Sequence, residues 1–284
     1  MVIAGGVESM TRAPYVSPKA EVAFGRSPAV FDSTIGWRMV NDRIASAHGT
    51  QSMGETAENV AARFGVPRAD QDAFALRAQG RYDAGWHAAD ILPVAVPGKG
   101  GGSVGTDEHP RATSLERLAA LPTPFREGGT VTAGNAAGIN DGAAALILAS
   151  AVGVRRHGLS PLARIGRAAS AGVAPSLMGI GPVAAVERLV ARGAARPADC
   201  EVIELNEAFA AQVLACTRVW GLADDDARVN AHGGGIAMGH PLGMSGARIA
   251  AAAARRLHEG GGRTALVTLC VGVGQGVALE LLGA

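Results

Sequence analysis

Short apolar runs alternate with amphipathic segments through the second half of the chain. The pattern predicts strands over residues 163–167, 202–205, 264–271 and 277–282, and helices over residues 182–192, 207–220 and 242–259. Strands that alternate with amphipathic helices are typical of βαβ units, in which helices cover both faces of a sheet. The chain is therefore predicted to belong to the α/β class.

The first half of the chain is less regular. The opening run MVIAGG is apolar and ends in glycines, which predicts a buried strand of a largely parallel sheet with neighbours on both sides. Residues 11–54 contain three prolines and show no sustained periodicity. Beyond them the pattern predicts helices over residues 55–64 and 69–88, a surface loop over residues 97–105 and a strand over residues 143–150.

Composition narrows the class of protein. Apolar residues make up 48% of the 284 residues and charged residues 18%, so a disordered tail or a charged coiled coil is excluded. The net charge is +1 and the arginines are scattered, which argues against a nucleic-acid partner. The longest apolar run, residues 142–154, is too short to cross a membrane, and we expect no signal peptide. Three widely spaced cysteines favour a reducing cytoplasm.

The most informative segment is NAHGGGIAMGHPLGMSGAR, residues 230–248. It predicts a glycine-rich turn that brings His240 to the N-terminal approach of a helix. The positive end of the helix dipole would lower the pKa of the imidazole there, and nearby backbone amides could bind an anion. Taken alone, the segment more often indicates a turn histidine that caps a helix.

Cys270 follows the predicted strand TALVTL and precedes Gly272 and Gly274. Glycines at this spacing allow backbone amides to converge beside the sulfur, as an oxyanion site requires, and the thiol could act as acid or base. A buried cysteine at a strand end is the alternative. No Cys or His stands at ligand spacing, so no metal site is expected.

Asn206 stands at the junction of a predicted strand, 202–205, and a predicted helix, in the sequence NEAFA. Active sites of open α/β sheets lie at that edge. An asparagine in this place is also a common N-cap, so the position alone leaves both interpretations open.

Together these segments resemble the thiolase family over essentially the whole chain. The matching stretches are AGGVESM, MGETAENVA, GTVTAGNAAGINDGAAA, MGIGPVAAV, ELNEAFA, NAHGGGIAMGHPLGMSGAR and LCVGVGQG. The resemblance implies a five-layered α/β/α/β/α core whose first half is incomplete here, with an inserted loop domain. Residues 1–11 and 139–153 would be the remnant of the N-terminal half, residues 12–138 the CoA-binding loop domain, and residues 154–284 the C-terminal half.

The resemblance also implies a division of roles within the site. His240 would activate a nucleophilic cysteine and help to bind the thioester oxyanion, and Asn206 would hold a water in the same oxyanion hole. Cys270 would protonate or deprotonate the α-carbon of acetyl-CoA, and the amide of Gly272 would contribute to a second oxyanion hole. Such an enzyme has coenzyme A as a substrate and needs no cofactor.

One departure from the family concerns the nucleophile itself. In the family, that cysteine lies on a helix upstream of the strand that begins here at Met1, and no residue of this sequence matches it. Cys200 precedes a predicted buried strand and Cys216 lies on an apolar helix, so both are expected in the core. We therefore expect a thiolase that lacks its N-terminal portion, is inactive alone, and exposes one flank of its MVIAGG strand.

Binding residues follow from the same resemblance. The matching positions for CoA are Met53, Arg111, Ala133 and Phe209, with Arg111 suited to a phosphate. The stretches RAPYVSPKAEVAF and STIGWRMVN resemble the branch that cleaves 3-oxoadipyl-CoA to succinyl-CoA and acetyl-CoA. That substrate ends in a carboxylate, and we expect a loop-domain cation, Arg38 or else Arg12, to pair with it.

Two other functions stay open at this point. The chain could be a non-catalytic, thiolase-like carrier of acyl-CoA or lipid, or a general acetyl-CoA acetyltransferase. The retained His-Pro turn and Cys-x-Gly-x-Gly loop favour an enzyme, because a carrier has no need of an acid/base thiol. The expected partners are acyl-CoA and CoA, with neither nucleic acid nor membrane, in a homodimer or homotetramer.

Overall fold

A four-stranded mixed sheet forms the centre of the computed structural model, which describes residues 1–98 and 100–284. Its order is β7–β10–β9–β8. The strands are β7 (Ala163–Gly172), β8 (Val202–Leu205), β9 (Thr264–Val271) and β10 (Gln275–Gly283). Strand β8 runs parallel to β9, whereas β10 is antiparallel to both of its neighbours. The bounds of β8 and β9 are those predicted from the sequence, and β7 extends five residues further.

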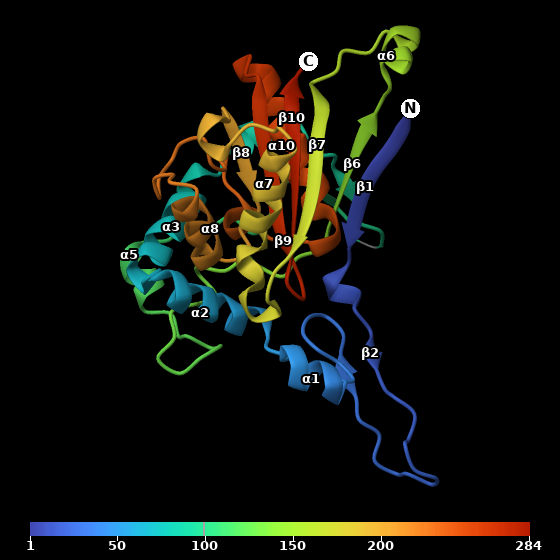
Figure 1. Cartoon of the computed structure of the whole chain (residues 1–284). Helices are drawn as coiled ribbons and strands as arrows, with labels where there is room; N and C mark the ends of the chain where they lie inside the picture. The colour runs from blue at the N-terminus through green and yellow to red at the C-terminus, as the bar shows by residue number, and fades with distance from the viewer. Residues whose placement is uncertain (99) are drawn as a thin grey trace.

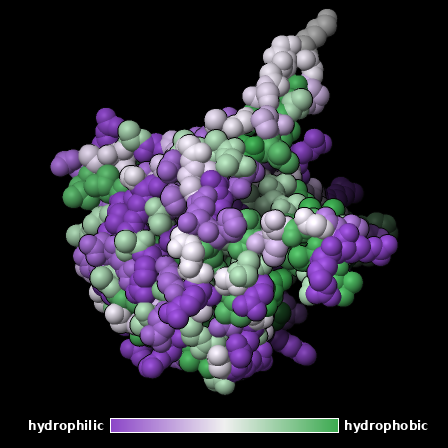
Figure 2. Space-filling model, turned by 90° about the horizontal axis from the view of Figure 1, so that it is seen from above, coloured by the Kyte–Doolittle hydropathy of each residue, from purple (hydrophilic) through white to green (hydrophobic). Residues whose placement is uncertain are grey.

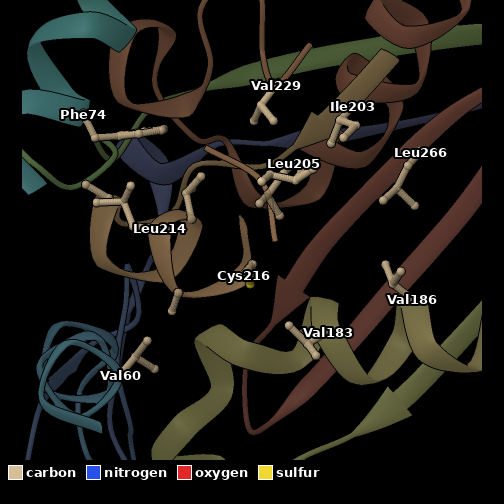
Figure 3. Packing of buried hydrophobic residues seen from close by; sticks show 14 of the residues in the cluster. Val60, Phe74, Val183, Val186, Ile203, Leu205, Leu214, Cys216, Val229 and Leu266 are labelled. Carbon is tan, nitrogen blue, oxygen red and sulfur yellow. The ribbon is translucent and has the colours of Figure 1, made fainter. Parts of the chain in front are cut away.

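Helices cover both faces of this sheet, as the alternating pattern predicted. Leu266 belongs to the apolar cluster under α7 (Gly181–Ala191) and α8 (Ala210–Val219). Its neighbours Ala265 and Val267 belong to the cluster under α10 (Leu242–Gly260) on the other face. This alternation follows from the two-residue period of a strand. Figure 3 shows part of the first cluster, in which Cys216 lies on the side of α8 that is nearer to Val183 of α7.

Strands β1 (Val2–Glu8) and β6 (Gly142–Leu148) form a separate two-stranded antiparallel ribbon beside the sheet (Figure 1). Helix α10 packs against both the ribbon and the sheet. The layers are therefore, in order, helices α7 and α8, the four-stranded sheet, helix α10, and the ribbon. The ribbon approaches α10 closely, because a Cβ at Gly6 would lie 1.8 Å from the carbonyl oxygen of Gly243.

The prediction of a buried, largely parallel β1 is wrong. Its described neighbour is antiparallel, and Ile3 and Val7 are 77% and 70% exposed. Only the alternate residues of β1 face α10, so its apolar pattern does not translate into burial on both faces. Figure 2 shows hydrophobic residues toward the side on which Figure 1 places β1 and β6.

The remaining elements connect these layers. They are η1 (Met10–Arg12), β2 (Tyr15–Val16), β3 (Phe31–Asp32), α1 (Asp42–His48), α2 (Met53–Phe64), α3 (Arg68–Arg81), α4 (Ala84–Ala88), β4 (Val94–Ala95), β5 (Ser103–Val104), α5 (Leu115–Ala119), α6 (Ala151–His157), η2 (Pro175–Ile180), η3 (Pro197–Asp199) and α9 (Gly235–Met238). Helix α2 begins with a capping box, in which the Ser52 hydroxyl accepts from Glu55 N and the Glu55 carboxylate accepts from Ser52 N.

Three predicted segments differ in detail. The single helix predicted over residues 69–88 is two helices, because Asp83 caps α4 by accepting from Trp86 N. The predicted loop 97–105 includes β5, which pairs with β4, and its residue 99 lies outside the described residues. The helix predicted from residue 207 begins at Ala210, since Phe209 has extended backbone angles.

Candidate active site

His240 is held in a tight turn immediately before α10. Its backbone N–H donates to Gly138 O at 3.1 Å, and the preceding Gly239 has a φ of 90°, which favours glycine. Burial, followed by the charge of Arg248, lowers the pKa of His240 to about 4. The sequence predicted a lowered pKa from the helix dipole, whereas the structure attributes it first to burial.

Two side chains contact the His240 ring, and the Asn206 amide nitrogen lies close to both ring nitrogens. Nδ1 lies 2.6 Å from the Ser245 hydroxyl, which itself donates to Pro241 O at 2.8 Å. Nε2 lies 3.3 Å from the amide nitrogen of Asn206. Sequence reasoning did not single out Ser245. The available signal was a serine in the first turn of the helix that follows the histidine.

Asn206 does not cap a helix. Its backbone N–H donates to Thr268 O at 3.0 Å, which places it at the end of β8, and its Nδ2 faces His240. The buried Oδ1 has no hydrogen-bond partner among the described residues. Such an acceptor is available to a water or to a donor of the substrate.

Glu207 braces this strand end, and sequence reasoning missed it. Its carboxylate is buried and accepts from Asn230 Nδ2 at 2.8 Å and from Ile236 N at 3.1 Å. The Asn230 side chain also exchanges hydrogen bonds with the backbone N–H and C=O of Leu205. These hydrogen bonds therefore connect the end of β8 to the turn that leads to His240. Burial raises the pKa of Glu207.

Cys270 lies at the carboxyl end of β9, next to β8. Leu205 pairs with Thr268 in the parallel register, so Asn206 and Cys270 stand at the same edge of the sheet. The chain thus brings His240, Asn206 and Cys270 together at one sheet edge. Burial raises the pKa of the Cys270 thiol to about 12, so the sulfur is protonated at neutral pH.

Gly272 lies in the exposed turn between β9 and β10. Val273 and Gly274 in this turn have φ values of 64° and 84°, and a Cβ at Gly274 would lie 2.4 Å from Val173 O. A positive φ is uncommon for a β-branched residue, so the turn is held under strain by its surroundings. The predicted role of the Gly272 amide stays a prediction.

Apolar residues surround the Cys270 sulfur. Phe209 and Met178 belong to the same buried cluster as Cys270, and Met53 packs against it. A hollow opens beside Met53, with an empty volume of about 240 Å³ that includes its mouth. Its lining is Trp37, His48, Gly49, Gln51, Met53, Thr56, Pro175, Ser176 and Val273.

The loop that carries Ala133 docks onto the same region. Ala137 N donates to Ala208 O at 3.0 Å, and Ala210 N donates to Asn135 O at 2.8 Å. The buried Glu58 carboxylate holds the start of this loop by accepting from the backbone of residues 130–131. Ala133 itself is exposed on the loop.

The two predicted cations are placed differently. The exposed Arg111 guanidinium lies 3.1 Å from the His109 ring, and that ring packs against Gly138, whose carbonyl accepts from His240. Arg111 is therefore linked to the loop beside the imidazole. Arg38 is exposed and its guanidinium donates to Gly36 O. It neighbours Trp37 in the chain but is outside the lining of the hollow.

The other two cysteines are core residues, as predicted. Cys200 and Cys216 are both buried, and Cys216 Sγ lies 3.5 Å from Gly179 O inside the main cluster. Within residues 1–98 and 100–284, no three His, Cys, Asp or Glu side chains are grouped to hold a metal ion. In the same part of the chain, no helix is long and apolar enough to span a membrane.

Comparisons with known proteins match the chain to one family. The family model "Thiolase, N-terminal domain" matches residues 1–152, and "Thiolase, C-terminal domain" matches residues 159–282. A "Beta-ketoadipyl-CoA thiolase" of Pseudomonas knackmussii is 58% identical over 99% of the chain and 72% of its own length. A "3-oxoadipyl-CoA/3-oxo-5,6-dehydrosuberyl-CoA thiolase" of Escherichia coli is 54% identical with the same coverage.

Solved structures are similar as well. The crystal structure of human mitochondrial 3-ketoacyl-CoA thiolase superposes with a TM-score of 0.89 at 38% identity. It covers 99% of this chain, which in turn covers 71% of that protein. A second crystal structure of the human protein, in complex with CoA, has the same TM-score and identity.

Proposed function

The chain belongs to the thiolase family, and we propose that it serves the thiolytic cleavage of 3-oxoadipyl-CoA to succinyl-CoA and acetyl-CoA. The observation that carries the proposal is the joint placement of His240, Asn206 and Cys270 at one sheet edge. The substrate is supported by the names of the relatives at 54–58% identity.

The protonation states of the site suit this chemistry. A general base must be neutral before it accepts a proton, and a general acid must hold one before it donates. Burial lowers the pKa of His240 to about 4 and raises that of Cys270 to about 12, so at pH 7 the imidazole is neutral and the thiol protonated. Two groups whose pKa values are pushed apart in this way fit a base and an acid.

Each step has a residue for its proton. His240 takes the proton of an attacking thiol, and the thiolate adds to the keto carbon of the substrate. The bond between the α-carbon and that carbon breaks, and Cys270 protonates the departing enolate to give acetyl-CoA. Free CoA then gives its thiol proton to the Cys270 thiolate and takes the acyl group from the enzyme sulfur, which regains its proton from His240. Asn206 and the Gly272 amide would stabilise the oxyanions of these steps.

The attacking thiol must come from outside these 284 residues. Of the three cysteines, Cys200 and Cys216 are enclosed in the core, and Cys270 is the proposed acid. The chain by itself is therefore expected to show no thiolysis of any 3-oxoacyl-CoA. Turnover by the purified 284-residue chain, measured as acetyl-CoA formed, would contradict this assignment.

We propose that the chain has three parts. Residues 12–138 form a loop domain that binds CoA. Residues 1–11 and 139–153 are the remnant of the N-terminal half, and residues 154–284 form the C-terminal half. Met53 and Phe209 are supported as CoA contacts by their packing around Cys270. Arg111 is supported as a phosphate partner by its exposed guanidinium next to the His240 loop. Ala133 is supported by its exposed place on the loop that docks against Ala208. We further propose a cytoplasmic homodimer or homotetramer.

Arg38 is proposed to pair with the carboxylate at the far end of the substrate. Its neighbour Trp37 lines the hollow beside Met53. Succinyl-CoA and butyryl-CoA form a matched pair of probes, because they differ mainly in that carboxylate. Arg38→Ala should weaken the binding of succinyl-CoA in calorimetry and leave butyryl-CoA unchanged.

Arg43→Ala, which removes an exposed charge on α1, serves as the control. In a chimera that carries the N-terminal segment of the Pseudomonas knackmussii relative, Arg38→Ala should raise KM for 3-oxoadipyl-CoA and spare acetoacetyl-CoA. Equal losses on both substrates would favour a general acetyl-CoA acetyltransferase. A relative of that name in Pseudomonas aeruginosa is 45% identical to this chain.

A further inference from the structure

The hydrogen bonds of Ser245 determine where the proton of the neutral His240 ring resides. Ser245 is fully buried in the first turn of α10, and its hydroxyl has two partners. One is Pro241 O at 2.8 Å and the other is His240 Nδ1 at 2.6 Å. A hydroxyl has a single proton to donate and two lone pairs that accept.

Only one assignment satisfies both contacts of Ser245. The carbonyl oxygen of Pro241 can only accept, so it takes the hydroxyl proton. The ring nitrogen Nδ1 must then donate to the hydroxyl oxygen, and the proton of the neutral imidazole lies on Nδ1. It follows that Nε2 carries a free lone pair.

The Asn206 amide does not distinguish the two ring nitrogens, so the assignment rests on Ser245. The amide nitrogen of Asn206 lies 3.3 Å from Nε2 and 3.5 Å from Nδ1. The opposite tautomer would require Ser245 to donate to Nδ1, which would take its hydroxyl proton away from Pro241 O.

We propose that Ser245 is a positioning residue, which holds His240 in the Nδ1–H tautomer and leaves Nε2 free to accept the proton of the attacking thiol. The role rests on the proposed function, but the tautomer itself needs no substrate. When Nε2 accepts that proton, the ring becomes an imidazolium whose Nδ1–H still donates to Ser245. The serine therefore supports the ring before and after the transfer without moving a proton of its own.

The test is nitrogen-15 NMR on the 284-residue chain with labelled histidine at pH 7. The chemical shifts of the two ring nitrogens report which one is protonated. His240→Gln identifies the signals of this ring among the seven histidines by their loss. We expect a protonated Nδ1 and an unprotonated Nε2 for His240.

Ser245→Ala should shift His240 toward the Nε2–H tautomer or a mixture of both. Thr217→Val is the matched control, because it removes another buried hydroxyl, which donates to Leu214 O at 3.2 Å within α8. It should leave the His240 signals unchanged. A protonated Nε2 in the unsubstituted chain would overturn the proposal, as would an unchanged tautomer in a folded Ser245→Ala variant.

These outcomes are independent of the substrate. If Ser245→Ala fails to fold, as circular dichroism would show, the spectrum of the unsubstituted chain still decides the tautomer. If the chain prefers another acyl-CoA, the ring signals are unaffected. A failure of the substrate assignment is thus distinguishable from a failure of the Ser245 proposal.

Discussion

The lowered pKa of His240 makes the stability of the fold depend on pH. Its pKa falls from 6.5 to about 4 on folding, because burial and the charge of Arg248 disfavour the imidazolium. Between these two values the unfolded chain binds a proton that the folded chain does not. Acid therefore favours unfolding. The titration of His240 lowers the free energy of unfolding as the pH falls from 6.5 toward 4.

The size of the effect follows from the shift. One pKa unit corresponds to about 1.4 kcal/mol, so a shift of roughly 2.5 units sets an upper limit of about 3 kcal/mol between pH 6.5 and pH 4. Other groups titrate in the same range, among them His109 and His232, whose pKa values are also lowered. A single pH series cannot separate them.

A comparison with His240→Gln isolates the one group. Urea unfolding of both proteins at pH 7, 6, 5 and 4 gives the free energy of unfolding at each pH. The other titrating groups largely cancel in the difference between the two proteins. The unsubstituted chain should lose up to about 3 kcal/mol more than the variant from pH 7 to pH 4.

Two results would refute the reasoning. If the difference between the two proteins is constant with pH, His240 titrates alike in the folded and unfolded chain. If NMR finds its pKa near 6.5 in the folded chain, burial does not disfavour the charged ring. Either result would show that burial does not keep the folded His240 ring neutral below pH 6.5.

Three further predictions concern other parts of the site. Glu58→Gln should lower the free energy of unfolding by about 2–3 kcal/mol in urea, because an amide cannot replace the carboxylate that accepts from three donors of the loop it holds. Gly274→Ala should lower Tm, since its φ is 84° and a carbonyl oxygen lies 2.4 Å from the added Cβ; Gly260→Ala, which meets open space, is the control. Iodoacetamide at pH 8 should modify Cys270 and Cys200 only slowly in the native chain and rapidly in guanidinium, because burial raises their pKa values to about 12 and about 11. Rapid native labelling, followed by mass spectrometry, would show that these thiols are not enclosed.

Much of the local structure could be predicted from the sequence. The bounds of β8 and β9 follow from continuous apolar runs, and the core positions of Cys200 and Cys216 follow from their apolar neighbours. The glycine-rich turn before a proline and an amphipathic helix also placed His240 correctly at the start of α10. Each of these features depends on residues within a few positions of one another, so hydrophobic period and backbone freedom determine them.

The contacts that make the site depend on tertiary structure instead. Asn206 meets His240 across 34 residues of chain, and Glu58 holds a loop 72 residues away. The apolar pattern of β1 could not reveal that its described partner is antiparallel. The sequence analysis did not identify Ser245, because its proposed role depends on the direction in which its hydroxyl donates a hydrogen bond. Propensity and period describe a segment relative to its own axis, whereas strand register and the close approach of buried polar groups arise only when separate segments pack together.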